Sequence, residues 1–221
     1  MSEVYFISGI DTDAGKSYCT GWLARQWANE GKSVITQKFV QTGSCGLSED
    51  IELHRRIMDI PLQPVDRDHT TAPVLFSYPC SPHLAAKIDR RELDLKKIEA
   101  STARLRELYD TVLIEGAGGL MVPLSEDYLT VDYIVDRKLP LIFVTHGGLG
   151  SINHTILSLE AIKSRGIEMP YILYNKVHDS EDSIIADDTR RYLAAYVGRH
   201  FPGTEIIDVP RIFLAPKAHE D

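Results

Sequence analysis

Short hydrophobic runs alternate along the chain with longer segments in which hydrophobic residues recur every three or four positions. The short runs are rich in β-branched residues and nearly uninterrupted, as expected for strands buried on both faces of a sheet. They predict six strands, at residues 4–8, 33–37, 111–115, 141–145, 171–175 and 205–209.

The longer segments have the periodicity of amphipathic helices. Leucine and isoleucine spacing predicts helices over 94–109, 152–164 and about 183–199. Gly31 and Gly166 stand where helix ends are expected. Strands that alternate with helices predict an α/β fold, with a mostly parallel sheet and helices on both faces.

Composition and charge narrow the class of protein. The chain has 221 residues, of which 43% are hydrophobic and 25% charged, and we expect a single domain over residues 1–221. A net charge of −8 argues against nucleic acid as a partner. No hydrophobic run approaches membrane-spanning length.

Localisation is expected to be cytoplasmic. The first residues, "MSEVYFISG", lack the character of a signal peptide. Cys19, Cys45 and Cys80 have no metal-like spacing, and an odd number of cysteines is better explained by reduced thiols than by a disulfide framework.

Unusual loops follow five of the predicted strands. They are "GIDTDAGKS" (9–17), "KFVQTGS" (38–44), "EGAGG" (115–119), "HGGLGSINH" (146–154) and "NKV" (175–177). Because the carboxyl ends of parallel strands meet at one edge of a sheet, these loops predict a ligand site at that edge.

The first loop resembles a phosphate-binding loop but departs from the strict pattern, since Ile10 stands where a glycine belongs and Gly9 comes one residue early. In such a loop Lys16 would contact phosphates and Ser17 would contact Mg²⁺, and the start of the helix would present free N–H groups to an anion. The alternative is an ordinary strand–turn–helix with an exposed lysine.

Three further charged residues belong to the predicted edge. Glu115 ends a predicted strand before a glycine-rich turn, which is the position of a Walker-B acid that helps to hold Mg²⁺. Asp50 lies near a helix start, where a first-turn acid is the simpler explanation. Lys38 ends the second strand and is either solvated or directed at an anionic ligand beside Lys16.

With these motifs together, the chain resembles the dethiobiotin synthetase family over residues 1 to about 210. The resemblance lies in the first two loops, in Asp50, and in "SPH" (81–83), "VLIEGAGGLMVPLS" (112–125), "LGSINHT" (149–155) and "YNKV" (174–177). The early glycine is usual in that family. Ser17 replaces the usual threonine, Phe39 replaces the usual proline, and "THGG" (145–148) departs from an apolar run.

The resemblance implies a P-loop NTPase-like fold and roles for individual residues. Lys16 and Lys38 would be catalytic, and Ser17, Asp50 and Glu115 would hold Mg²⁺. The residues implied to bind ATP are Thr12, Asp13, Ala14, Gly15, Lys16, Ser17, Tyr18, Asp50, Glu115, Gly116, Ala117, Gly118, Asn175, Lys176, Val209, Pro210 and Arg211. Those implied to bind substrate are Thr12, Lys38, Thr42, Leu149, Gly150 and Asn153.

The family reaction implies the substrates 7,8-diaminononanoate, CO₂ or bicarbonate, and ATP. One amine captures CO₂ as a carbamate, ATP phosphorylates the carbamate, and the second amine closes a cyclic urea. The resemblance also implies a homodimer in which the loop from Leu149 to Asn153 serves the substrate of the neighbouring subunit. The alternative is that Ser151 caps its own helix.

Three other functions fit parts of the pattern. A corrinoid-type amidoligase shares the loop style, but would need a glutaminase domain. A nucleotide-switch ATPase of the partition or division-site type would carry a signature lysine where this chain has Asp11. A nucleotide-binding scaffold without catalysis would not need Lys16, Lys38, Asp50 and Glu115 together.

Overall fold

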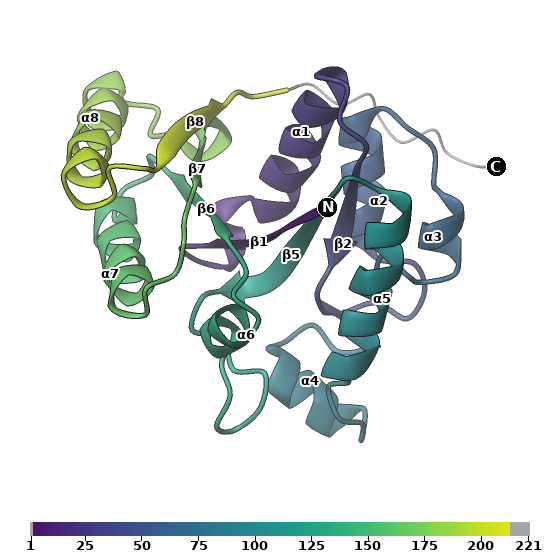
Figure 1. The fold of residues 1–221 in the computed structure, drawn as a ribbon. Helices are drawn as coiled ribbons and strands as arrows, with labels where there is room; N and C mark the ends of the chain where they lie inside the picture. The colour runs from purple at the N-terminus through teal and green to yellow at the C-terminus, as the bar shows by residue number, and fades with distance from the viewer. Residues whose placement is uncertain (1, 213–221) are drawn as a thin grey trace.

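A six-stranded, fully parallel sheet forms the centre of the molecule (Figure 1). The computed structural model describes residues 2–212. The strands lie in the order β2-β5-β1-β6-β7-β8. Their bounds are β1 Glu3–Gly9, β2 Val34–Lys38, β5 Thr111–Gly119, β6 Leu141–His146, β7 Tyr171–Asn175 and β8 Glu205–Val209. All six predicted strands are confirmed.

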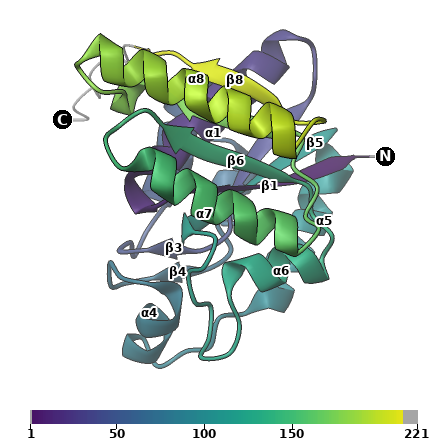
Figure 2. The same cartoon turned by 90° about the vertical axis from the view of Figure 1, so that its left-hand side faces the viewer.

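Helices cover both faces of the sheet, as predicted. They are α1 Lys16–Asn29, α2 Glu49–Met58, α3 Pro64–Arg67, α4 Pro82–Ile88, α5 Leu95–Leu108, α6 Thr130–Asp136, α7 Ser151–Ser164 and α8 Ser183–His200, with short 3₁₀ turns η1 Thr12–Ala14 and η2 Lys176–His178. Figure 2 shows α7 and α8 side by side on the face of the sheet in front of β6. The three predicted helices correspond to α5, α7 and α8.

Two hydrophobic clusters join the helices to the sheet, and alternate strand residues point into each. On β1, Phe6 enters the cluster shared with α5, α6, α7 and α8, while Ile7 enters the cluster shared with α1 and α2. On β5, Ile114 and Leu113 divide in the same way. This alternation explains the nearly continuous hydrophobic runs in the sequence.

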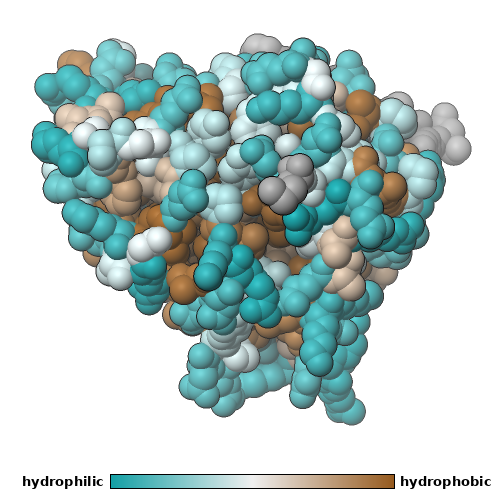
Figure 3. Space-filling view, in the orientation of Figure 1, coloured by the Kyte–Doolittle hydropathy of each residue, from teal (hydrophilic) through white to brown (hydrophobic). Residues whose placement is uncertain are grey.

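A smaller parallel pair, β3 Gln41–Thr42 with β4 Leu75–Phe76, lies outside the main sheet. Most of the molecular face in Figure 3 is hydrophilic, with hydrophobic side chains visible in a band across its middle. None of the helices formed by residues 2–212 has the length and hydropathy that a transmembrane segment requires.

One predicted strand end is wrong. β5 continues four residues past Glu115, to Gly119, so Glu115 lies within the strand and pairs in register with Lys38 on β2 and Ile7 on β1. The strand continues through glycine residues 116, 118 and 119, where an added Cβ atom would crowd its neighbours. A Cβ atom on Gly116, for example, would lie 2.9 Å from the ring of Phe6.

Candidate active site

The loop between β1 and α1 explains the displaced glycine. A Cβ atom on Gly9 would lie 3.1 Å from the carbonyl oxygen of Val144 on the neighbouring strand β6, so this position favours glycine. Ile10 instead packs partly against both hydrophobic clusters. The early glycine therefore serves close strand packing, and the loop beyond it remains free to form a phosphate cradle.

Gly15 shapes that cradle at the start of α1. Its φ of 80° lies in the left-handed region, which suits glycine, and no side chain caps the first turn of the helix. The uncapped turn leaves backbone N–H groups available to an anion. The buried side chain of Asn175 secures the loop, since its Nδ2 atom donates to Ala14 O at 3.0 Å and its Oδ1 atom accepts from Val177 N at 3.0 Å.

Lys16 is not the exposed lysine of the alternative interpretation. Its side chain is buried, and Nζ donates to the carbonyl oxygens of Asp11 at 2.7 Å and Thr12 at 3.2 Å. Burial lowers the pKa of Lys16 to about 8, against an ordinary value of 10.5. One N–H of the ammonium group remains for a ligand.

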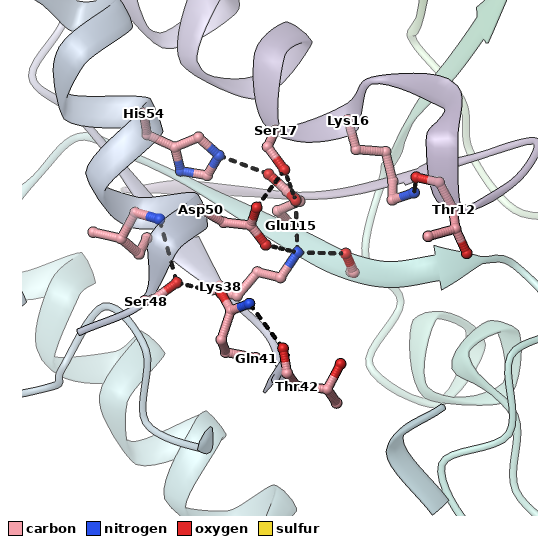
Figure 4. A network of polar contacts seen from close by, with 12 residues as sticks. Thr12, Lys16, Ser17, Lys38, Gln41, Thr42, Ser48, Asp50, His54 and Glu115 are labelled. Carbon is pink, nitrogen blue, oxygen red and sulfur yellow. Dashed lines mark hydrogen bonds and ion pairs between the residues drawn. The ribbon is translucent and has the colours of Figure 1, made fainter. Parts of the chain in front are cut away.

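Lys38, Asp50, Glu115 and Ser17 meet beside this loop (Figure 4). The Nζ atom of Lys38 lies 2.6 Å from Asp50 Oδ2 and 2.6 Å from Glu115 Oε1, and it donates to Gly116 O at 3.2 Å. Ser17 Oγ lies 2.8 Å from Asp50 Oδ1 and 2.8 Å from Glu115 Oε1. The structure thus brings together four of the predicted site residues from β2, α2, β5 and α1.

Opposite charges meet in this largely buried cluster. Burial alone would raise the pKa of the Glu115 carboxyl, but Lys38 and His54, both within 2.6 Å, hold it well below its ordinary value. Burial would lower the pKa of Lys38, but Glu115 and Asp50 raise it above its ordinary value. Lys38 is therefore a charged residue of the interior, and the interpretation as a solvated lysine is wrong.

The donor set suits a magnesium ion that is completed by phosphate. The Ser17 hydroxyl lies between the carboxylates of Asp50 and Glu115. Mg²⁺ prefers one or two protein carboxylates together with substrate phosphates and water. Within residues 2–212, no cluster of three or more His, Cys, Asp or Glu forms a site that the protein alone would complete. Asp50 also occupies the first turn of α2, where Ser48 is the N-cap.

His54 was missed by the sequence analysis. It follows Asp50 by four residues on α2, so that both side chains reach Glu115 or its partners from one helix face. His54 is fully buried, and Nε2 lies 2.6 Å from Glu115 Oε2. The spacing from Asp50 is the signal that could have identified it.

Tyr18 and the segment after β8 lie near the phosphate loop and make contacts separate from those of the Lys38 cluster. The Tyr18 hydroxyl donates to Pro210 O at 2.9 Å, and Arg211 donates to Val177 O at 3.3 Å. Lys176 pairs with Asp208 at 3.2 Å. The residues predicted to contact adenine are therefore close to one rim of the loop. The segment 213–221 lies outside the described residues.

The predicted substrate residues fall into two groups. Thr42 lies on β3, directly beyond Lys38 and the buried Phe39 and Val40. Leu149, Gly150 and Asn153 lie at the start of α7, and within residues 2–212 no hydrogen bond or ion pair joins them to the Lys38 cluster. All of the predicted substrate residues, including Thr12 after β1, lie at or beyond the carboxyl ends of parallel strands and so at the predicted edge, but only Lys38 belongs to the charged cluster.

Gly150, and not Ser151, is the N-cap of α7. Gly150 has φ 89°, and Ser151 is the first helical residue. Capping by Ser151 is therefore wrong. Its Oγ atom is buried and has no hydrogen-bond partner among the described residues, while Leu149 beside it is 92% exposed.

Comparison with other structures supports the fold. The chain is similar to a pNOB8 ParA structure bound to nonspecific DNA, with a TM-score of 0.56 and 13% identity, over 100% of this chain and 89% of that one. A ParA family ATPase from Chlorobium tepidum TLS gives a TM-score of 0.52 at 16% identity, over 96% and 86% of the two chains. At these identities the similarity shows a P-loop NTPase-like fold alone.

Comparison with other sequences is more specific. A family model described as an AAA domain matches residues 3–207. The ATP-dependent dethiobiotin synthetase BioD 2 of Pasteurella multocida is 47% identical, over 95% of this chain and 99% of that protein. The ATP-dependent dethiobiotin synthetase BioD of Chlorobaculum tepidum is 50% identical, over 94% and 87%, and the BioD 2 enzyme of Haemophilus influenzae 54% identical, over 79% and 92%. With the phosphate loop and the Lys38 cluster in place, the chain belongs to the dethiobiotin synthetase family.

Proposed function

We propose that this protein is an ATP-dependent dethiobiotin synthase. It joins CO₂ to 7,8-diaminononanoate and closes the ring of dethiobiotin, with release of ADP and phosphate. The observation that carries the proposal is the position of Lys38, which lies between Asp50 and Glu115 within reach of Ser17 and the phosphate loop. The identity of the substrates follows from the relationship to the dethiobiotin synthetase family. Residues 1–221 would act as one P-loop α/β domain.

The chemistry places two negative groups in contact. One amine of the substrate bonds to CO₂ and loses a proton, which gives a carbamate. A carbamate oxygen bonds to the γ-phosphorus as ADP leaves, and the second amine then attacks the carbonyl carbon, loses a proton and expels phosphate. Lys16 and Lys38 offset the repulsion between the carbamate and the phosphates, which is the main demand of phosphoryl transfer.

Lys38 must change partners during this cycle. Its three N–H donors are directed at Asp50, Glu115 and Gly116. To contact a carbamate oxygen, Lys38 exchanges one carboxylate for the substrate. Ser17, Asp50 and Glu115 would hold Mg²⁺, which supplies positive charge at the phosphates. Thr12 and Thr42 would contact the diamine and carbamate end of the substrate.

The proposed enzyme is a homodimer that completes each site across the interface. Ser151 Oγ is buried and has no hydrogen-bond partner within residues 2–212, at an uncapped helix start that suits a carboxylate. Leu149, Leu157 and Met121 expose hydrophobic side chains, and the last two border a hollow of about 470 Å³ between α7 and residues 119–122. We propose that the neighbouring subunit covers this surface and that its substrate tail reaches Leu149, Gly150 and Asn153.

We also propose a cytoplasmic location and no nucleic-acid or membrane partner. Cys19, Cys45 and Cys80 form no disulfide, and the chain carries a net charge of −8.

The test is phosphate release from MgATP in the presence of bicarbonate, with and without diaminononanoate, with dethiobiotin followed by mass spectrometry. Phosphate and dethiobiotin are expected in equal amounts and only with the diamine. If phosphate is released at the same rate with and without the diamine and no dethiobiotin forms, the proposal is rejected and the nucleotide-switch alternative is favoured.

A further inference from the structure

A row of buried polar side chains leads from Glu115 into the interior behind the candidate site. The row is Glu115, His54, Thr36, Arg55 and Asp66, each 3% exposed or less. His54 links the two halves, with Nε2 2.6 Å from Glu115 Oε2 and Nδ1 3.0 Å from Thr36 Oγ1. Polar groups at this depth are costly unless hydrogen bonds satisfy them, so the arrangement has limited freedom.

The chemistry of each group sets the direction of these hydrogen bonds. An arginine can only donate, so Thr36 Oγ1 accepts from Arg55 Nη1 at 2.7 Å. The Thr36 hydroxyl then has its own proton to donate to His54 Nδ1. An ionised carboxylate can only accept, so His54 Nε2 carries a proton and donates it to Glu115. Every group in the row is satisfied when the imidazole points Nε2–H at Glu115.

Arg55 fixes the far end of the row. Its Nε and Nη2 atoms donate to the two oxygens of Asp66 at 2.9 and 2.7 Å. Thr71 Oγ1 and the backbone N–H of Gln63 also donate to Asp66, each at 2.7 Å. A rotation of the His54 ring would take the donor away from Glu115 Oε2 and the acceptor away from the Thr36 hydroxyl proton, which disfavours any other orientation.

The two oxygens of Glu115 therefore have different environments. Oε2 faces His54 in the interior, whereas Oε1 faces Ser17 and Lys38 at the loop (Figure 4). We propose that His54 is a positioning residue, which holds Glu115 by Oε2 and so presents Oε1 to the metal that accompanies the nucleotide. This inference rests on the proposed function for the magnesium site. Hydrogen bonds behind a ligating carboxylate have this effect in metal sites generally.

A purely structural role is the competing explanation, because His54 also satisfies a buried acceptor. The two roles differ in which replacements succeed. Glutamine places an amide N–H near the position of imidazole Nε2, asparagine places one near Nδ1, and leucine offers none. Positioning requires the donor at the first location, whereas packing depends on the shape and volume of the side chain.

The test measures Mn²⁺ binding to the ADP complex by electron paramagnetic resonance in His54→Gln, His54→Asn and His54→Leu. We expect His54→Gln to bind Mn²⁺ within about threefold of the unaltered protein. His54→Asn and His54→Leu should bind it about ten- to a hundredfold more weakly, the usual range for loss of a partner behind a metal ligand. ADP binding in the presence of EDTA should stay unchanged in all three.

Thr71→Val is the matched control, because it removes a buried hydrogen bond from the same row without touching Glu115. It should lower the melting temperature and leave Mn²⁺ affinity unchanged. The proposal is overturned if His54→Asn and His54→Leu bind Mn²⁺ normally, or if His54→Gln is as weak as they are. Should His54→Leu fail to fold, the comparison of glutamine with asparagine still decides. The assay contains no diamine, so failure of the proposed synthase activity would be seen separately.

Discussion

The Nζ atom of Lys38 lies 2.6 Å from Oε1 of Glu115, and the two residues are in register on the adjacent parallel strands β2 and β5. Strand pairing therefore holds this ion pair at the carboxyl edge of the sheet, beside the phosphate loop. Because both side chains are buried, this pair determines both the charge of the site and part of the stability of the fold.

Replacement of Lys38 by methionine should abolish most activity and destabilise the protein. We expect kcat to fall at least a hundredfold. The free energy of unfolding should fall by about 3 kcal/mol at neutral pH, because the buried Glu115 carboxylate loses the lysine that neutralises its charge. Urea unfolding and steady-state kinetics measure the two effects. Near-normal turnover would show that Lys38 does not contact the reacting groups.

The stability loss in Lys38→Met should depend on pH. In the unaltered protein the folded pKa of Glu115 lies below its ordinary value of 4.5, so Glu115 stabilises the fold above that pH, and the contribution is lost as the pH falls through the folded pKa. The difference between protein and variant should be largest at neutral pH and shrink below about pH 4.5. A constant difference would contradict this account.

Nucleotide binding should take up a proton at alkaline pH through Lys16. Its pKa of about 8 means that the free protein loses this charge above pH 8, while bound phosphates favour the charged form. The Kd for ADP should rise about tenfold between pH 7 and pH 9. Calorimetry in two buffers with different protonation enthalpies would detect the proton. Lys16→Arg, which stays charged, should show a much flatter dependence.

Asp50→Asn and Glu115→Gln should impair the use of Mg²⁺ more than nucleotide binding. The Mg²⁺ concentration for half-maximal activity should rise at least about tenfold, whereas ADP affinity in EDTA should change little, because the loop backbone still binds phosphate. Glu49→Gln is the matched control, since Glu49 is exposed in the same first turn of α2. Mg²⁺ curves identical to that of Glu49→Gln would exclude a metal role.

Tyr18→Phe should weaken ATP binding without affecting chemistry. The lost hydroxyl donates to Pro210 O and accepts from Ile212 N, so the segment after β8 is no longer held beside the phosphate loop. We expect KM for ATP to rise at least about threefold, in line with two lost hydrogen bonds, at nearly constant kcat. Tyr192→Phe on the surface of α8 serves as the control. Equal KM values for the two variants would show that the segment after β8 does not contribute to ATP binding.

Mixed dimers test whether each site spans two subunits. Lys16→Ala and Asn153→Asp should each be inactive alone. A fully exchanged equal mixture should regain about one quarter of normal activity, because half of the dimers are mixed and one of their two sites escapes both changes. A mixture of Lys16→Ala with Lys38→Ala should stay inactive, since both residues belong to the same subunit's site. No recovery in the first mixture would place each site within one chain.

The sequence by itself determined the strands, the longer helices and the edge of the sheet that carries the loops. These are local properties, because strand burial appears as hydrophobic runs and helix burial as a period of 3.6 residues. The phosphate loop is also a local feature, whereas the reason for its displaced glycine, the close approach of Gly9 to Val144, lies in the packing of β1 against β6. The short elements α3, α4, α6, β3 and β4 lack enough residues to show a period.

Only the tertiary structure decided which side chains face one another. The pairing of Lys38 with Glu115 depends on β2 and β5 being neighbours, although 77 residues separate the two positions. The burial of His54 against Glu115 depends on the packing of α2 beside β2, and the position of Ser151 as the first residue of α7 depends on Gly150 being the N-cap. Such relationships arise from long-range packing, and a periodic pattern along one segment carries no information about its neighbours in space.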